Sequence, residues 1–322
     1  MVEPNRRMVV AGLAAFITNP ALAGWPERSI TITHGLGPGG GVDTTARILA
    51  EHLSRRLGQQ VIVEAMQGSA SVIAASHVAR SAADGHNLAL FPSTYGAAAA
   101  LRRKLGFRPV EDFTTVSQVS EFPYIIATYR EHAITSLEGL IGAARSAPQP
   151  LLYGTPGQGS AQHLLMVQLE RQAGIKFQHV PFARGGLQQL TEVLAKRIDL
   201  IVDAPITLSE HFASGTLRPI AVSTKERSNQ LPDTPSIFEA GFGDFDVRGW
   251  MGLVGPAGMP GEVVHRLNAE VAAILADAGV AERLRVLGTV ARASSPELLR
   301  DRLAADIAKW TAVIDEAGIE RI

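Results

Sequence analysis

Short apolar runs alternate along this chain with longer stretches in which apolar residues recur at the period of an α-helix. In the first such stretch the apolar positions are spaced by four, three, four and four residues: Val42, Ala46, Leu49, Leu53 and Leu57. This spacing places them on one face of a helix. A second helix is predicted over residues 71–80, and three apolar runs predict buried strands over residues 29–33, 60–64 and 87–91. The β-α-β-α-β order predicts a parallel sheet with right-handed crossovers.

The same alternation begins again near Tyr124 and predicts a second α/β half. Its predicted strands cover residues 124–129, 151–155, 177–182, 198–204 and 217–223. A helix is predicted over residues 160–174, where Gly174 suits the position just beyond a helix C-terminus. A further strand over residues 249–258 precedes amphipathic helices over 261–275 and 295–318, and Ser295 suits the N-cap of the last. The chain is therefore predicted to form two α/β halves, each with its own sheet.

Composition narrows the class of protein. The 322 residues are 46% hydrophobic and 19% charged, which favours a globular protein with sizeable cores. The formal net charge of −1 disfavours a nucleic-acid partner. The absence of cysteine excludes disulfides, thiol catalysis and cysteine-ligated metals. The nine histidines do not fall into a metal-binding spacing, so a metal site is not expected.

The N-terminus has the pattern of an export signal. Arg6 and Arg7 form a basic start, residues 8–17 are apolar, and residues 21–23 read Ala-Leu-Ala. A small-x-small triplet after a short apolar run is typical of a cleavage site. Residues 1–23 are therefore predicted to be a signal peptide that directs the protein to the periplasm, and the paired arginines suit a twin-arginine route. The alternative is a frayed amphipathic N-terminus in a cytosolic protein.

A glycine-rich loop over residues 34–43 matches two kinds of site. Gly35, Gly37 and Gly40 satisfy G-x-G-x-x-G, and Glu64 follows 24 positions after the last of them. This is the fingerprint of a dinucleotide site with its ribose-binding acid. The match supports one alternative function, an exported nucleotide-dependent oxidoreductase.

Asp43 argues against a dinucleotide in this loop. It is expected to cap the helix that follows, and its carboxylate would then repel a pyrophosphate at the same N–H groups. A smaller ligand held by the N–H groups of residues 39–41 avoids that conflict, while Pro38 offers no N–H. Export points the same way, because nicotinamide cofactors are scarce outside the cytoplasm.

A second glycine loop, over residues 153–163, also lies between a strand and a helix start. If both loops face one cleft, their N–H groups predict a pincer for a small anion. The alternative is that the glycines serve only tight turns. Ser160 and His163 raise the possibility of a hydrolase, but Gly-x-Gly-Ser is not the G-x-S-x-G nucleophile elbow, and an N-cap role for Ser160 is favoured. Asp203 ends a predicted strand, where α/β sheets place ligand groups, or it forms a turn before Pro205.

From residue 25 to residue 322 the sequence resembles the extracytoplasmic solute-binding receptors of tripartite tricarboxylate transporters, also called the Bug (Bordetella uptake gene) family. The segments that carry the resemblance include PGGGVDTTARILAEHL, ADGHNLAL, YGTPGQGSAQHL, LRPIAVSTKERSNQLPDTPSIFEAG and WMGLVGPAGMP. It implies a two-domain periplasmic binding protein of the type II-like, Venus flytrap kind. Each domain would be a mainly parallel sheet flanked by helices. The implied boundaries are residues 24–124 plus 249–322 for domain 1 and residues 125–248 for domain 2.

The resemblance also implies a receptor without catalysis and without a cofactor that captures a small carboxylate, such as a dicarboxylate, a tricarboxylate or an amino acid. Its expected partners are the permease subunits of the transporter, and the protein is expected to be monomeric. A ligand sensor for a signalling system is the alternative that shares the same pocket. The residues expected to contact the ligand are Leu36, Gly37, Pro38, Gly39, Gly40, Asp43, Ser69, Ala70, Ser93, Gly157, Gly159, Ser160, Ala161, His163 and Asp203.

Overall fold

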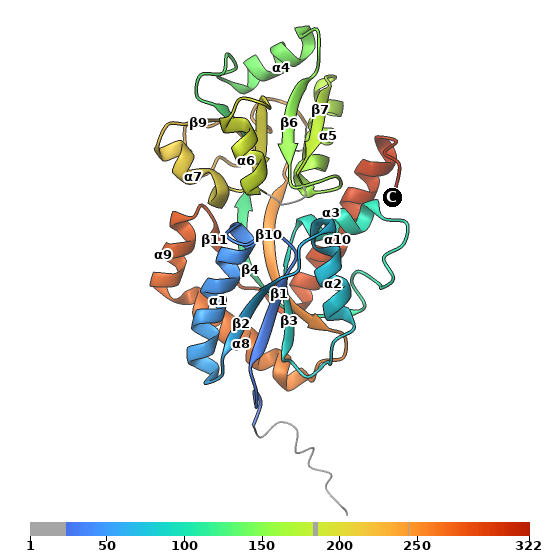
Figure 1. The fold of residues 1–322 in the computed structure, drawn as a ribbon, viewed down its shortest axis with the longest axis vertical. Helices are drawn as coiled ribbons and strands as arrows, with labels where there is room; N and C mark the ends of the chain where they lie inside the picture. The colour runs from blue at the N-terminus through green and yellow to red at the C-terminus, as the bar shows by residue number, and fades with distance from the viewer. Residues whose placement is uncertain (1–23, 183–185, 244) are drawn as a thin grey trace, which may run out of the picture.

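The structure is a computed structural model that describes residues 24–182, 186–243 and 245–322. The predicted signal peptide, residues 1–23, lies outside the described residues. Two separate sheets form the framework, one above the other along the long axis of the molecule (Figure 1). We call the part built on the first sheet lobe 1 and the part built on the second sheet lobe 2.

Lobe 1 contains a six-stranded sheet in the order β11-β4-β10-β3-β1-β2. Its strands are β1 (Ile30–His34), β2 (Val61–Ala65), β3 (Asn87–Pro92), β4 (Phe113–Pro123), β10 (Arg248–Pro256) and β11 (Val290–Ala291). The helices around this sheet are α1 (Gly41–Leu57), α2 (Val72–Ala79), α3 (Thr94–Leu101), α8 (Gly261–Ala276), α9 (Ala278–Val286) and α10 (Pro296–Glu316), with a short 3-10 helix, η2, at Ser69–Ser71.

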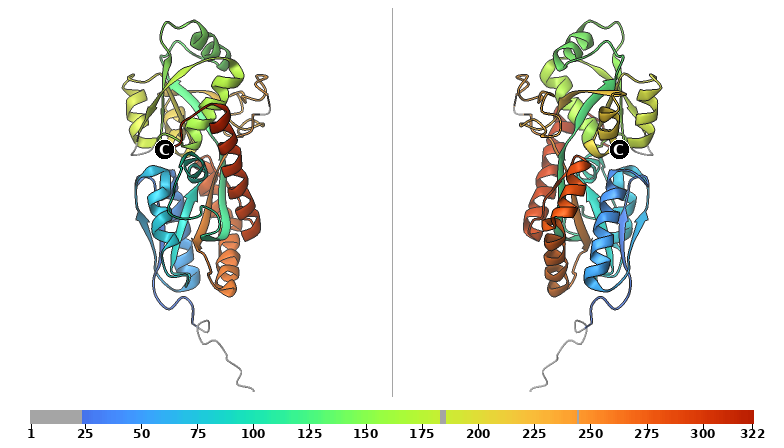
Figure 2. Two further views of the ribbon diagram at one scale, coloured as in Figure 1. Left: turned by 90° about the vertical axis from the view of Figure 1, so that its right-hand side faces the viewer. Right: turned by 90° about the vertical axis from the view of Figure 1, so that its left-hand side faces the viewer.

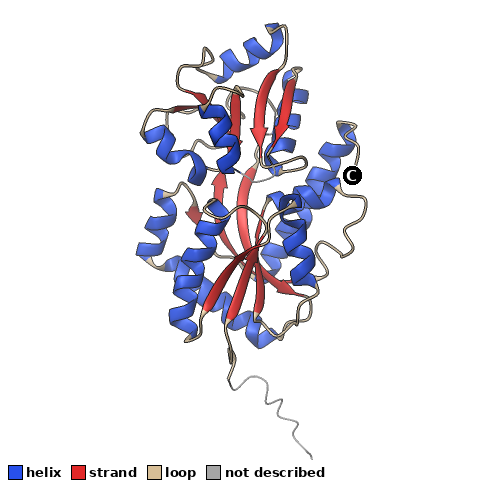
Figure 3. Ribbon diagram, in the orientation of Figure 1, coloured by secondary structure: helices blue, strands red, loops and turns tan. Residues whose placement is uncertain are grey.

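Lobe 2 contains a five-stranded sheet in the order β7-β6-β8-β5-β9. Its strands are β5 (Ile125–Tyr129), β6 (Leu151–Thr155), β7 (Phe177–Pro181), β8 (Leu200–Asp203) and β9 (Leu217–Val222). Its helices are α4 (Leu137–Ser146), α5 (Ala161–Ala173), α6 (Gly186–Leu194) and α7 (Pro205–Ala213). Helices flank both sheets (Figure 3), which confirms the predicted α/β architecture.

Both sheets are mixed, because the chain passes from one lobe to the other and returns. Strand β1 pairs in parallel with β2 and β3, and β6 pairs in parallel with β7 and β8, as the β-α-β order predicts. Strand β10 enters lobe 1 from lobe 2 and runs antiparallel to β3 and β4. Strand β5 enters lobe 2 from lobe 1 and runs antiparallel to β8 and β9. The predicted strand over residues 249–258 therefore belongs to lobe 1.

The two passages between the lobes are tied together by Ser223. The chain enters lobe 2 at Tyr124 and returns between β9 and β10. The buried hydroxyl of Ser223 accepts a hydrogen bond from the N–H of Tyr124 (2.9 Å) and donates one to the carbonyl of Val247 (2.5 Å). The backbone of Ser223 also bonds to both residues: its N–H donates to the carbonyl of Tyr124 (3.0 Å), and its carbonyl accepts from the N–H of Val247 (2.8 Å). Ser223 therefore links the two passages through both its side chain and its backbone.

Helix α10 runs beside lobe 1 and reaches lobe 2 (Figure 2). Glu316 near its end forms an ion pair with Arg171 of α5 (2.6 Å), and Lys309 donates to the carbonyl of Asp246 (2.9 Å). Ser295 caps the helix as predicted, accepting from the N–H of Leu298 (3.3 Å). Within the described residues, no helix is long and apolar enough to cross a membrane. The predicted domain boundaries, residues 24–124 plus 249–322 and residues 125–248, stay a prediction.

We predict that Ser223→Ala destabilises the fold by about 2–3 kcal/mol, because the N–H of Tyr124 and the carbonyl of Val247 would both lose a buried partner. The free energy of unfolding in urea would measure this. The control is Ser146→Ala, because that exposed hydroxyl bonds only to the carbonyl of Gly142, and its loss should cost less than about 0.5 kcal/mol. Equal, small effects from both substitutions would contradict the role given to Ser223.

Candidate functional site

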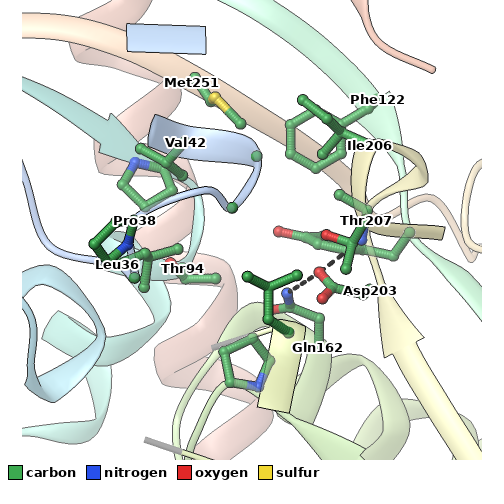
Figure 4. A pocket seen from close by; sticks show the side chains of 18 residues that line it. Leu36, Pro38, Val42, Thr94, Phe122, Gln162, Asp203, Ile206, Thr207 and Met251 are labelled. Atoms are coloured by element: carbon green, nitrogen blue, oxygen red, sulfur yellow. Dashed lines mark hydrogen bonds between the residues drawn. The ribbon is translucent and has the colours of Figure 1, made fainter. Parts of the chain in front are cut away.

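A pocket lies between the two lobes and is lined by both (Figure 4). The lobe 1 residues that line it are Leu36, Gly37, Pro38, Gly40, Gly41, Val42, Pro92, Thr94, Phe122 and Met251. Tyr124, at the passage between the lobes, also lines it. The lobe 2 residues are Pro156, Gln162, Leu187, Asp203, Ala204, Ile206 and Thr207. The pocket therefore combines an apolar middle with polar groups at helix starts.

Four helices begin at this pocket. Gly41 and Val42 open α1, Thr94 opens α3, Gln162 is the second residue of α5, and Ile206 is the second residue of α7. The first N–H groups of a helix have no partner within the helix, and each helix N-terminus carries a partial positive charge. Four such termini around one cavity make it attractive to an anion.

The lobes touch across the pocket. A Cβ atom on Gly41 would lie 2.4 Å from Cγ2 of Ile206, so only a glycine fits between α1 and α7. Gly159 has φ of +74°, and a Cβ there would lie 2.5 Å from Cδ2 of Leu101 in α3. The pocket has a volume of about 60 Å³, below the roughly 300–1,000 Å³ of most ligand pockets. The two lobes therefore lie close together at this pocket.

Asp43 does not cap helix α1, which corrects the sequence-based expectation. Gly40 is the N-cap and Asp43 is the third residue of the helix. The buried carboxylate of Asp43 accepts hydrogen bonds from the N–H of Gly39 (3.0 Å) and from Nε of Arg47 (2.8 Å), and its other oxygen lies 3.0 Å from Nε2 of His34. Asp43 thus holds the glycine loop onto the helix that follows it.

These contacts shift the pKa values of both Asp43 and His34. Burial alone would raise the pKa of Asp43, but hydrogen bonds from Arg47, Gly39 and His34 outweigh it and hold the pKa below its usual value. Burial lowers the pKa of His34, although Asp43 opposes that shift. A neutral His34 therefore donates from Nε2 to a charged Asp43.

The N–H groups of the first loop that were expected to bind a ligand also differ from those that the structure leaves unbonded. The N–H of Gly39 is taken by Asp43, and that of Gly40 points to the carbonyl of Gly37 at 3.4 Å. The N–H groups left for a ligand are those of the first helical residues, Gly41 to Asp43, two residues later than the predicted 39–41.

The second glycine loop uses several of its N–H groups internally, and the predicted pincer of two glycine loops stays a prediction. The N–H of Gly157 donates to Thr155 (3.2 Å), that of Gly159 to Nδ1 of His163 (3.2 Å), and that of Ser160 to the carbonyl of Gly157 (3.1 Å). The hydroxyl of Ser160 accepts from the N–H of His163 (3.2 Å), which is the predicted N-cap. This loop therefore serves turns and capping.

His163 stacks on His179 with ring centroids 4.2 Å apart. Burial lowers the pKa of His163 to about 4, and burial together with the neighbouring His163 lowers the pKa of His179 to about 3. Both rings are neutral at pH 7, so they offer no positive charge to an anion. His179 lies 2.6 Å from the hydroxyl of Thr155, within the same loop network.

Asp203 lies at the end of β8 and is buried in the pocket wall. Its carboxylate accepts from Nε2 of Gln189 (2.6 Å), from the N–H of Ala204 (2.7 Å) and from Nε2 of Gln162 (3.4 Å). Burial raises the pKa of Asp203 to about 6, although these donors oppose the shift. The carboxylate is held by neutral donors and is poorly solvated.

The structure brings some predicted site residues together and leaves others outside the pocket lining. Those that line the pocket are Leu36, Gly37, Pro38, Gly40 and Asp203. Asp43 and Gly39 are outside the lining and are bonded to each other next to it in the sequence. Ser93 precedes α3, and its hydroxyl bonds to the Tyr124 hydroxyl (2.6 Å). Two groups of predicted residues lie outside the pocket lining. The first belongs to the second glycine loop and the start of α5: Gly157, Gly159, Ser160, Ala161 and His163. The second is Ser69 and Ala70, which lie in η2. Their roles as ligand contacts stay a prediction.

Sequence reasoning missed several lining residues, among them Thr94, Phe122, Gln162, Ile206 and Met251. The sequence offered one signal for Thr94. It comes three residues after the predicted strand over 87–91, close to the strand end where α/β sheets place ligand groups. Residues 24–182, 186–243 and 245–322 contain no cluster of three or more histidine, aspartate and glutamate side chains suited to a metal ion.

Comparison with known proteins identifies the family. The sequence profile described as "Tripartite tricarboxylate transporter family receptor" (TctC) matches residues 45–319. The chain belongs to this receptor family.

Full-length relatives agree with this assignment. A UPF0065 protein from the tcbD-tcbE intergenic region of Pseudomonas sp. strain P51 is 31% identical over 318 residues, covering 97% of this chain and 94% of that protein. Protein BugT of Bordetella pertussis is 27% identical over 322 residues, covering 98% of each chain.

Solved structures show the same fold. The R. palustris protein Rpa4515, solved with adipate, has a TM-score of 0.88 and 31% identity, covering 92% of this chain and 100% of that one. MatC from Rhodopseudomonas palustris, with bound malate, has a TM-score of 0.83 and 30% identity, covering 90% and 100%. The periplasmic binding protein BugD has a TM-score of 0.86 and 28% identity, covering 92% and 99%.

The receptor family, the Bug relatives and the periplasmic binding protein fold are thus as the sequence predicted. The protein is a solute-binding receptor and not an enzyme, which removes the oxidoreductase and hydrolase alternatives. A periplasmic location is supported by the family and its structural relatives.

The raised pKa of Asp203 predicts a pH-dependent stability difference between the ligand-free protein and Asp203→Asn. Well below pH 4 the carboxyl is protonated in both the folded and the unfolded chain, and it imposes no penalty. Between about pH 4 and the folded pKa of about 6, the unfolded chain releases its proton first, so the wild type loses stability as pH rises. The variant should gain roughly 3 kcal/mol relative to the wild type across this range. Urea unfolding at pH 4 and pH 7.5 measures it; a constant difference would show that Asp203 titrates normally.

Proposed function

We propose that this receptor captures a small carboxylate between its two lobes and delivers it to the permease subunits of a tripartite tricarboxylate transporter. The observation that carries the proposal is the convergence of four helix N-termini on one largely apolar pocket between the lobes. A carboxylate suits the helix N-termini, and a short carbon chain suits the apolar side chains between them.

Helices α1 and α3 supply the anion-binding wall in this proposal. Gly41 and Val42 line the pocket at the start of α1, and their N–H groups have no partner within the helix. Thr94 lines it at the start of α3. Similar receptors in solved structures hold adipate and malate, which supports a carboxylate here.

Capture would follow a two-state mechanism. The empty protein opens about the passages at Tyr124 and Ser223, and a ligand that touches both lobes favours the closed form. The closed form then docks on the permease as a monomer. Residues 1–23 would direct export and be removed, with residues 24–124 plus 249–322 and residues 125–248 as the two moving domains.

Isothermal titration calorimetry against citrate, dicarboxylates, monocarboxylates and amino acids tests the proposal. At least one carboxylate should bind with a stoichiometry of one per chain, because the four helix starts share a single pocket. Failure of every carboxylate to bind to protein shown by circular dichroism to be folded would overturn it.

Gly41→Ala should weaken carboxylate binding while leaving each lobe folded. The new Cβ would lie 2.4 Å from Cγ2 of Ile206, so the closed form would be strained by about 1–3 kcal/mol, which weakens binding roughly five- to 150-fold. Gly261→Ala is the matched control, because Gly261 also opens a helix, α8, and a Cβ there meets nothing within 4 Å. Unchanged affinity in both variants would show that closure of α1 on α7 is not needed for binding.

A further inference from the structure

The two walls of the pocket differ in hydrogen-bonding character. The lobe 1 wall presents N–H groups at the starts of α1 and α3. The lobe 2 wall contains Asp203, a buried carboxylate that carries negative charge when ionised, next to the starts of α5 and α7. Asp203 accepts the N–H of Ala204, which precedes α7, and the side-chain amide of Gln162, the second residue of α5, so its carboxylate lies close to both helix starts.

Asp203 also fixes the orientation of two buried amides. A carboxylate only accepts hydrogen bonds, so Gln162 and Gln189 must turn their NH₂ groups toward it, at 3.4 Å and 2.6 Å. Their carbonyl oxygens are thereby directed elsewhere. Oε1 of Gln162 and Oε1 of Gln189 are buried and have no hydrogen-bond partner among the described residues. Gln162 itself is 3% exposed and lines the pocket.

Buried acceptors without a partner are costly, and they are uncommon in folded proteins. Here an unpaired amide oxygen and a carboxylate held only by neutral donors occur together on one wall of a ligand pocket. A ligand that donates a hydrogen bond would satisfy this wall. A ligand that placed a second carboxylate against it would meet like charge in a poorly solvated site.

We propose that the ligand carries, in addition to the carboxylate bound by lobe 1, a hydroxyl or ammonium group that donates to the lobe 2 wall at Asp203 and Gln162. The ligand is then a hydroxy- or amino-carboxylate rather than an unsubstituted acid. This inference rests on the proposed function, and it narrows the substrate class of the same pocket.

Matched acids that differ in one substituent test this inference on the wild-type protein. Three sets of increasing length are titrated by calorimetry at pH 7.5: propionate, lactate and alanine; succinate, malate and aspartate; glutarate, 2-hydroxyglutarate and glutamate. In the set that fits the pocket, the hydroxyl or amino member should bind at least about tenfold more tightly than the unsubstituted acid, because only it satisfies the buried acceptors.

Variants assign the preference to the lobe 2 wall. Asp203→Asn replaces one acceptor oxygen by a donor of the same shape and should reduce the preference to less than about threefold. Asp233→Asn is the matched control, because Asp233 is exposed in the same lobe, and it should keep the full preference. If Asp203→Asn does not fold, Gln162→Met serves instead, because it removes the amide oxygen at similar length and should lower the preference in the same way.

The possible outcomes separate this inference from the proposed function. Tight binding of the substituted acids, lost in Asp203→Asn, supports both. Binding of unsubstituted acids as tightly as their hydroxyl and amino counterparts overturns the inference and leaves carboxylate capture intact. A preference that survives in Asp203→Asn or Gln162→Met also overturns it. Absence of binding to any acid overturns the proposed function itself.

Discussion

The unpaired N–H groups at helix N-termini are the constraint on which the rest of this structure depends. In a β-α-β unit the helix begins beyond the carboxyl end of the strand before it, so α1 and α3 begin at the edge where β1 and β3 end. The same rule places the starts of α5 and α7 beyond β6 and β8 in lobe 2. The lobes face each other through these edges. Four helix starts therefore share one small space, and that space favours a negatively charged ligand.

Local sequence patterns predicted most of the framework, because they reflect contacts within each element. The apolar face of α1 and the short apolar runs of β1 and β6 were placed to within a residue. Strand β4 was missed because its buried polar residues are satisfied by distant partners, as when Ser117 donates to the carbonyl of Ser294 (3.1 Å). Helix α3 was missed because it is buried on all sides and shows no amphipathic period.

The site was predicted in outline, but its hydrogen bonds were not. The glycine spacing correctly drew attention to the loop before α1, yet a spacing does not reveal which N–H groups are already occupied. Asp43 takes the N–H of Gly39, and His163 takes that of Gly159. The match to a dinucleotide fingerprint is misleading for a related reason: the N–H of Gly39, which a pyrophosphate would need, already binds the carboxylate of Asp43. Gln162 became visible only when the fold placed it beside Asp203, 41 residues away in the sequence.

The central claim is that a carboxylate is held between the lobes by the first N–H groups of α1. Amide chemical shifts in ¹⁵N-labelled protein test it most directly, recorded before and after addition of the acid that binds best. We expect large downfield proton shifts for Gly41 and Val42, because their N–H groups gain a charged acceptor. Small shifts are expected for Gly157 and Gly159, whose N–H groups are already bonded within their own loop. Large shifts at Gly157 and Gly159, with Gly41 and Val42 unchanged, would contradict it.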